Sequence, residues 1–223
     1  MRLLILGANG RTGQLAIDDA LKRGHTVTAL VRKAPSMQAR DGVTVVQGTP
    51  LSQPDIEKAF AATPKDTIRA VLVTLNASRE TDSPFSKPVS PPNLIRDSVR
   101  NVTAVMAKHS VKRIVIMSAF GVGSSYQQLP YVLRPVFRCT NMSVQMKDHD
   151  DVDAEVRKSE GLHWTLVRPA MLKEGAAAPA RELGETGKGA GLLSGITRAS
   201  VAEFMIKAVE EGTWMREPVV IAN

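Results

Sequence analysis

The chain has 223 residues, 43% of them hydrophobic, which is enough for one α/β domain with a substantial core. The formal net charge is +7, but only 4% of residues are aromatic, so stacking platforms for nucleic acid are scarce. A solvated basic surface or a site for a polyanionic cofactor explains this charge better. The single cysteine, Cys139, excludes an intrachain disulfide, and no apolar run approaches the length of a membrane span.

These limits predict a cytoplasmic protein that binds a small-molecule substrate and has no nucleic-acid or membrane partner. We expect no metal, because His25, His109 and His163 lack ligand spacing with carboxylates or with Cys139. The oligomeric state stays open between monomer and dimer.

The first expected element is a strand from Leu3 to Leu6, which is followed by three glycines, Gly7, Gly10 and Gly13. A helical pattern begins directly after them. Such a turn points backbone N–H groups and a helix dipole at an anion, and glycine lets a pyrophosphate approach the backbone. A plain β–α turn with packing glycines is the alternative. A second strand at 25–31 completes a βαβ unit and favours a dinucleotide site.

The rest of the chain alternates strands with helices. We expect strands at 43–47, 70–74, 113–117, 163–167 and 219–221, and helices at 54–62, 93–109, 144–159 and 200–211. This order predicts a doubly wound parallel sheet, a Rossmann fold, in one domain spanning 1–223 with a small C-terminal substrate lobe. Substrate-side loops are expected at about 78–92, 119–142 and 170–199, and the Gly/Ala-rich part at 175–195 is predicted to be a mobile flap.

The residues at the end of the second strand indicate which nicotinamide cofactor binds. An acid near this position binds both ribose hydroxyls of NAD, whereas an arginine suits the 2′-phosphate of NADP. Here the strand ends in Arg32 and Lys33, and Arg11 in the glycine turn is a further candidate. An ordinary surface arginine is the alternative. The sequence therefore predicts NADP(H).

Several stretches resemble a known family. Residues 7–13 with Arg32, residues 100–120 and residues 160–169 are similar to the atypical short-chain dehydrogenase/reductases. The closest resemblance is to the NAD(P)H-binding, NmrA-like group that includes biliverdin-IXβ/flavin reductase, and it covers most of the chain. The resemblance implies cofactor contacts from Gly7, Asn9, Gly10, Arg11, Thr12, Gly13, Asn76, Ala77, Ser78, Arg79, Ser118, Ala119, Phe120, Arg168, Pro169, Ala170 and Met171. One departure is Gly48-Thr49, where the family often has Gly-Asp with its acid near the adenine.

Many short-chain reductases protonate the substrate oxygen with a tyrosine, a lysine four residues later and a serine. Ser118 fits the serine, and Tyr131 follows it at a plausible distance. However, prolines stand four residues after both Tyr131 and Tyr126, so the Tyr-x-x-x-Lys pair is absent. Without the lysine a tyrosine is a poor base near neutral pH. Both tyrosines stay candidates for substrate contact, with half-buried loop aromatics as the alternative.

His149 is a further catalytic candidate, in the run from Lys147 to Asp151. A histidine suits acid–base chemistry near neutral pH, and Asp150 or Asp151 are candidates to orient it. The alternative is a set of acids that stabilise a helix N-terminus beside a solvated histidine. If no strong acid is present, direct hydride transfer with a proton from water is the simplest mechanism.

Together these residues predict an NADPH-dependent reductase that acts on a carbonyl, quinone, flavin or similar conjugated acceptor. Two alternatives stay open. The missing Tyr-x-x-x-Lys pair favours a non-catalytic, NmrA-like NADP(H) sensor, and a cofactor-assisted tailoring isomerase is the third reading. The short chain favours the reductase, but a fold cannot choose among substrates.

Overall fold

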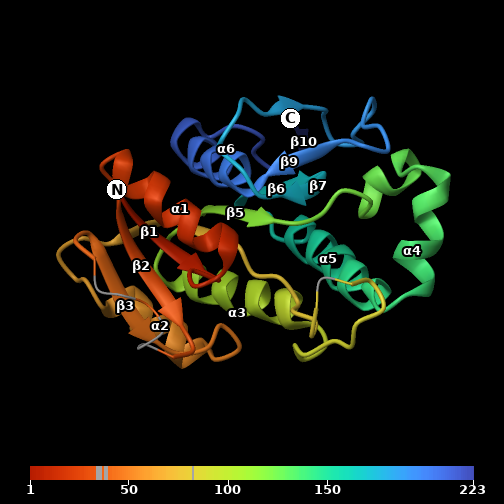
Figure 1. Ribbon diagram of the computed structural model, residues 1–223. Helices are drawn as coiled ribbons and strands as arrows, with labels where there is room; N and C mark the ends of the chain where they lie inside the picture. The colour runs from red at the N-terminus through yellow and green to blue at the C-terminus, as the bar shows by residue number, and fades with distance from the viewer. Residues whose placement is uncertain (34–36, 38–39, 82) are drawn as a thin grey trace.

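The computed structural model describes residues 1–33, 37, 40–81 and 83–223, and within them an eight-stranded sheet forms the centre of the molecule (Figure 1). Its order is β3-β2-β1-β4-β5-β6-β10-β8. The strands are β1 (Arg2–Leu6), β2 (Thr26–Val31), β3 (Val43–Gln47), β4 (Ile68–Val73), β5 (Arg113–Met117), β6 (His163–Pro169), β8 (Arg181–Glu182) and β10 (Glu217–Ala222). All pairs are parallel except that β8 runs antiparallel to β10.

Helices cover both faces of this sheet. In Figure 1, α1 (Arg11–Lys22) and α6 (Arg198–Glu211) lie on one face, and α2 (Gln53–Ala61), α3 (Leu94–Lys108) and α5 (Met142–Arg157) lie on the other. Side chains alternate between the two faces: Leu3 and Ile5 belong to the core under α1 and α6, whereas Leu4 and Leu6 belong to the core under α2, α3 and α5. Burial on both faces explains why the strands read as continuous apolar runs.

The predicted Rossmann fold is confirmed, and the expected strands and helices lie within a few residues of their observed bounds. Differences gather on the substrate side. The loop expected at 119–142 contains η2 (Gly123–Gln128), η3 (Tyr131–Leu133) and α4 (Arg134–Cys139). These elements are too short for a hydrophobic period to reveal them.

Strand pairing holds part of the segment 175–195, which the sequence predicts to be a mobile flap. Its strand β8 pairs with β10, so the sheet is antiparallel at this edge, contrary to the prediction of a parallel sheet. A separate two-stranded sheet joins β7 (Met171–Lys173) to β9 (Gly195–Thr197) at either end of the segment. Within the described residues, no helix is both long and apolar enough to cross a membrane.

The strand order reverses between β1 and β4, and ligands of such sheets bind outside the carboxyl ends of the strands near this point. The segments that follow β1, β4, β5 and β6 all start at this edge. They carry the residues that the sequence singles out.

Candidate functional site

In the turn after β1, the backbone is packed so closely at Gly7 and Gly13 that no side chain fits at these positions. Gly7 has a φ of 87°, and its carbonyl accepts a 2.9 Å hydrogen bond from the N–H of Gly10. A Cβ on Gly13 would lie 2.2 Å from that same carbonyl oxygen. Helix α1, which starts here, has no capping side chain and no acid in its first turn. Its first N–H groups therefore stay available to an anion, in a cradle that only glycine permits.

Polar side chains surround this turn. Asn9 is exposed and accepts a 3.3 Å hydrogen bond from Gln14, whereas Thr12 is buried. The guanidinium of Arg11 reaches Glu174 at 3.3 Å, and Glu174 also accepts from Arg198 at 2.8 Å. The segment after β7 thereby meets the glycine turn.

An open pocket lies at the ends of β2 and β3. It is lined by Arg32, Gln47, Gly48, Thr49, Asp55 and Lys58. Arg32 and Lys58 are exposed cations on its wall, and Lys33, also exposed, follows Arg32. The pocket is thus positively charged at the position where an adenosine 2′-phosphate is expected.

Asp55 brings a carboxylate to the Gly48-Thr49 turn from helix α2. One of its oxygens accepts a 3.0 Å hydrogen bond from the N–H of Thr49. An acid therefore stands beside this turn, although the turn itself lacks the aspartate that the family resemblance leads one to expect. A Cβ on Gly48 would lie 2.6 Å from Cβ of Asp55, so the turn and the helix approach closely.

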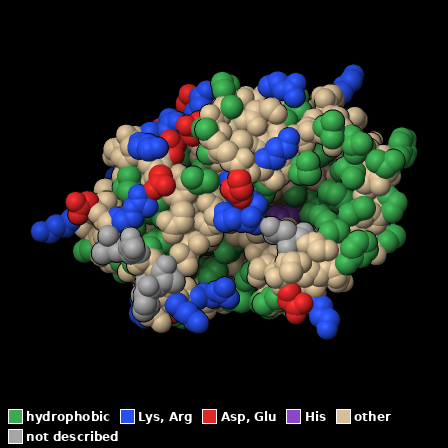
Figure 2. Space-filling view, viewed as in Figure 1, with side chains coloured by type: hydrophobic (Ala, Val, Ile, Leu, Met, Phe, Trp, Pro, Cys, Tyr) green, Lys and Arg blue, Asp and Glu red, His purple; other side chains and the backbone are tan. Residues whose placement is uncertain are grey.

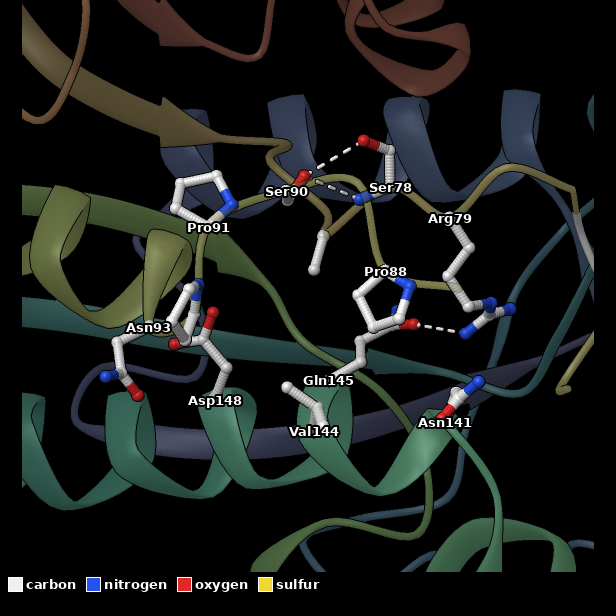
Figure 3. Close-up of a pocket in the computed structure, with 12 residues that line it drawn as sticks. Ser78, Arg79, Pro88, Ser90, Pro91, Asn93, Asn141, Val144, Gln145 and Asp148 are labelled. Carbon is white, nitrogen blue, oxygen red and sulfur yellow. Dashed lines mark hydrogen bonds between the residues drawn. The ribbon is translucent and has the colours of Figure 1, made fainter. Parts of the chain in front are cut away.

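The loop after β4 folds back against α5 (Figure 3). Arg79 donates a 2.8 Å hydrogen bond to the side-chain oxygen of Gln145, whose amide nitrogen in turn bonds Asn76. Ser78 bonds Ser90 through both its backbone N–H and its hydroxyl, at 2.8 and 2.9 Å. Asn76 is exposed and Ala77 is half-buried. The loop predicted at 78–92 thus closes onto α5, and only a small pocket remains between them.

Ser118 follows β5 and is 5% exposed. In β5, Ile114 and Ile116 face the core under α3 and α5, so alternation directs Ser118 to the same side. Its N–H donates to the carbonyl of Val167 at 2.6 Å, but its hydroxyl has no hydrogen-bond partner among the described residues. A buried hydroxyl left without a partner is costly, and such groups often serve a ligand.

His149 lies on α5 between two side chains that reach neighbouring strands. Gln145, one turn before it, bonds Asn76 after β4, and Asp153, one turn after it, bonds Arg168 on β6. This spacing places His149 over the strand between them, β5, which Ser118 directly follows. His149 is 2% exposed, and its Nδ1 has no partner within the described part of the chain.

Burial lowers the pKa of His149 to about 4, so the ring is neutral near pH 7. The expectation of a titration near neutrality is therefore wrong, because desolvation disfavours the imidazolium. The expected orienting acids are also wrong. Asp150 accepts from the N–H of Gly123 at 2.8 Å, and Asp151 accepts from Lys147 at 2.9 Å.

The aromatic candidates differ in burial. Phe120 is buried, and its N–H donates to the carbonyl of Pro169 at 3.0 Å, with half-buried Ala119 before it. Tyr126 is half-buried against the cluster around Phe120 and carries the guanidinium of Arg138 4.4 Å from its ring centre. Tyr131 is 80% exposed, with Arg134 at 4.0 Å. Of the two tyrosines, only Tyr126 reaches the interior.

Arg168 has a fully buried side chain. Its guanidinium donates to Asp153 at 2.6 Å, to the hydroxyl of Ser124 at 2.8 Å and to the carbonyl of Glu185 at 3.0 Å. Protein groups therefore satisfy both terminal nitrogens of Arg168, whereas its buried Nε has no partner among the described residues. In the view of Figure 2 the surface is hollowed near its middle, with a histidine inside the hollow and hydrophobic side chains to its right, where Figure 1 places α4.

The comparisons with known proteins agree with this geometry. A model of the NAD(P)H-binding family matches residues 7–212. The chain belongs to this NAD(P)H-binding family. It also aligns with the uncharacterized protein YwnB of Bacillus subtilis (strain 168), at 46% identity over 41 residues. That match covers 18% of this chain and only 19% of the curated relative.

Solved structures share the whole fold of this NAD(P)H-binding protein at low identity. ChuY, an anaerobillin reductase from Escherichia coli O157:H7, has a TM-score of 0.76 and 19% identity over 99% of this chain and 96% of its own. The oxidoreductase ylbE from Lactococcus lactis has a TM-score of 0.75 and 16% identity, covering 100% and 91%. A short-chain dehydrogenase/reductase from Veillonella parvula DSM 2008, in complex with NADP, has a TM-score of 0.71 and 14% identity, covering 100% and 94%.

Sequence reasoning missed Asp55, Lys58, Gln145 and Asp153 of this NAD(P)H-binding protein. The two residues of α2 become visible only when the helix folds over the β2–β3 pocket. For Gln145 and Asp153 a signal was present, since both stand four residues from His149 on one helix face.

Proposed function

We propose that this protein is an NADPH-dependent reductase that transfers hydride to a small conjugated or carbonyl acceptor. The observation that carries the proposal is the Ser118 hydroxyl, which is buried, without a partner among the described residues and located after β5 on the side of α5. The reductase and oxidoreductase with the same fold support this class of reaction.

The chain's residues fit the cofactor. The glycine cradle leaves N–H groups of α1 for the pyrophosphate, and Arg32 with Lys58 supplies positive charge for a 2′-phosphate. This charge favours NADP(H) over NAD(H); Lys33 directly follows Arg32, and Arg11 is a further cation at the glycine turn. When bound, the cofactor supplies the hydride, and the protein supplies position and shape.

Each residue near Ser118 has a distinct task. The Ser118 hydroxyl donates a hydrogen bond to the acceptor atom that gains negative charge, and the proton itself comes from water. His149 is neutral, so it acts as a fixed polar group and not as the general acid. Phe120 and Tyr126 form the apolar side of the acceptor site, which suits a flat conjugated molecule.

A non-catalytic NADP(H) sensor is the second candidate. The neutral state of His149 favours it, because this residue then offers no acid for carbonyl reduction near pH 7. A sensor binds the cofactor without turnover.

The test is NADPH oxidation with a panel of quinones, flavins and aromatic ketones. We expect turnover with at least one acceptor, and about 100-fold slower turnover in Ser118→Ala at unchanged NADPH affinity. Ser98→Ala is the matched control, since Ser98 is also buried but bonds the carbonyl of Leu94 in its own helix. Tight NADPH binding with no turnover across the panel would instead establish the sensor.

A further inference from the structure

Two segments border the site on the side where Phe120 lies. The first, here called the η2 wall, comprises residues 120–129 and contains η2. The second, the 183–190 wall, follows β8. Their side chains meet in one small cluster, in which Leu183 and Ala190 pack with Phe120 and Leu129.

We infer that Arg168 is a positioning residue that fixes both walls at once, and so sets where Phe120 and Tyr126 lie relative to Ser118. The inference rests on the proposed function for its kinetic consequence. One guanidinium nitrogen, Nη1, donates both to the Ser124 hydroxyl in the η2 wall and to the Glu185 carbonyl in the 183–190 wall. The other, Nη2, is held by Asp153 of α5. A single planar group therefore joins three segments to β6.

Two glycines show how closely the walls are fitted. Gly123 has a φ of 54°, and a Cβ on it would lie 2.6 Å from Nη2 of Arg168 and 2.7 Å from a carboxylate oxygen of Asp153. A Cβ on Gly187 would lie 2.8 Å from the ring of Phe120. The η2 wall thus rests directly on the ion pair, and the 183–190 wall rests on Phe120.

The location of Arg168 connects these walls to the reacting side chain. Met117 pairs with Val167 across β5 and β6, so Ser118 and Arg168 are the next residues in register, and both face α5. A shift of the Arg168 head group moves Ser124 and, through the chain, Phe120. Lysine cannot replace it, because an ammonium is a compact point charge that lacks the rigid fork needed for three partners in different directions.

An exposed ion pair offers a matched contrast. Arg157, at the end of α5, shares two residues with the Arg168 cluster, since it donates to Asp153 of its own helix at 2.6 Å and to the Glu185 carboxylate at 3.1 Å. Its side chain is 45% exposed, so solvent competes for both contacts. Arg157→Gln therefore removes an exposed link between α5 and the 183–190 wall while it leaves the buried Arg168 contacts in place.

Amide hydrogen exchange on Arg168→Lys tests the inference without any acceptor. We expect exchange to rise about tenfold in both walls together, with no change in β1 and α1. Arg157→Gln should leave both walls within about twofold of the unmodified protein. Gly123→Ala, which retains Arg168 and Asp153 but forces a methyl group between their ion pair and the η2 wall, should raise exchange in that wall and serves if Arg168→Lys does not fold.

A kinetic experiment measures the KM of the acceptor and the Kd of the cofactor separately. In Arg168→Lys and in Gly123→Ala we expect KM for the acceptor to rise about tenfold while the Kd of NADPH stays unchanged. Loosening of only one wall in Arg168→Lys, or equal effects of Arg168→Lys and Arg157→Gln on both walls, would overturn the inference. If the unmodified protein turns over no acceptor, the proposed function fails, but the exchange experiment still decides the role of Arg168.

Discussion

The glycine turn after β1 and the cluster around Arg168 hold the two ends of the site in different ways. The turn uses backbone atoms: at Gly7 and Gly13 the backbone segments approach so closely that a Cβ does not fit. The cluster uses buried side chains from segments distant in sequence, which share one guanidinium. The glycine turn is therefore expected to be most sensitive to added side-chain volume, and the Arg168 cluster to loss of the guanidinium that its segments share.

The largest effect is expected at Gly13. In Gly13→Ala the new methyl group would lie 2.2 Å from the Gly7 carbonyl oxygen, so either the turn or α1 must shift. We expect NADPH affinity to fall at least about 100-fold, as measured by fluorescence titration.

Gly161→Ala is the control for that substitution. A Cβ there meets nothing within 4 Å, so cofactor affinity should not change. Near-normal NADPH binding by Gly13→Ala would show that the tight turn is not what holds the cofactor.

A pH dependence is expected at the acceptor end. Burial lowers the pKa of His149 to about 4, whereas in the unfolded chain the ordinary value is about 6.5. Between these values the unfolded chain binds the extra proton, so the free energy of unfolding decreases as pH falls from about 6.5 to about 4, by up to about 3 kcal/mol. Urea unfolding at several pH values measures this slope.

His149→Gln should flatten that slope, because the titrating ring is gone. The exposed His163 is the matched position, and His163→Gln should keep the slope. Equal acid sensitivity of His149→Gln and the unmodified protein would contradict a buried neutral ring.

A smaller effect is expected at the β2–β3 pocket. Arg32→Gln and Lys58→Gln should each weaken NADPH about tenfold and leave NADH within about twofold, because only NADPH carries the 2′-phosphate. Competition titrations with both nucleotides measure this. Lys65→Gln, an exposed lysine that does not line the pocket, controls for net charge. Parallel losses for NADPH and NADH would refute the assignment of the pocket.

The smallest effect is expected at the surface of the Arg168 cluster. Arg157→Gln loses two partly exposed ion pairs, so the free energy of unfolding should fall by at most about 1 kcal/mol. Chemical denaturation measures the change. A loss of several kcal/mol would mean that the exposed pairs, and not the buried guanidinium, hold the walls.

The sequence signals for the proposed cofactor end are local. Glycine spacing, the strand before it and Arg32 lie within one βαβ unit, although Thr74 and, through Arg11, Glu174 also reach the turn from distant parts of the chain. The β2–β3 pocket is harder to predict from the sequence, since Lys58 reaches it from α2.

The acceptor end is less predictable because burial and long-range contacts decide it. His149 stands in an acidic run that suggests a solvated ring, yet α5 turns it inward and lowers its pKa. Arg168 looks like a strand-end cation, but Asp153, Ser124 and Glu185 converge on it only after folding. Neither the burial of His149 nor the partners of Arg168 can be predicted from the local hydrophobic periodicity.

Isotope transfer tests the central claim most directly. NADPH carrying deuterium at the nicotinamide C4 is incubated with the protein and the acceptor panel, and the products are analysed by mass spectrometry. The account predicts that deuterium leaves the cofactor as an acceptor is reduced, and stays in the product where the hydride is added to carbon, at a rate about 100-fold lower in Ser118→Ala than in Ser98→Ala. Tight NADPH binding with all of the label retained on the cofactor would contradict it.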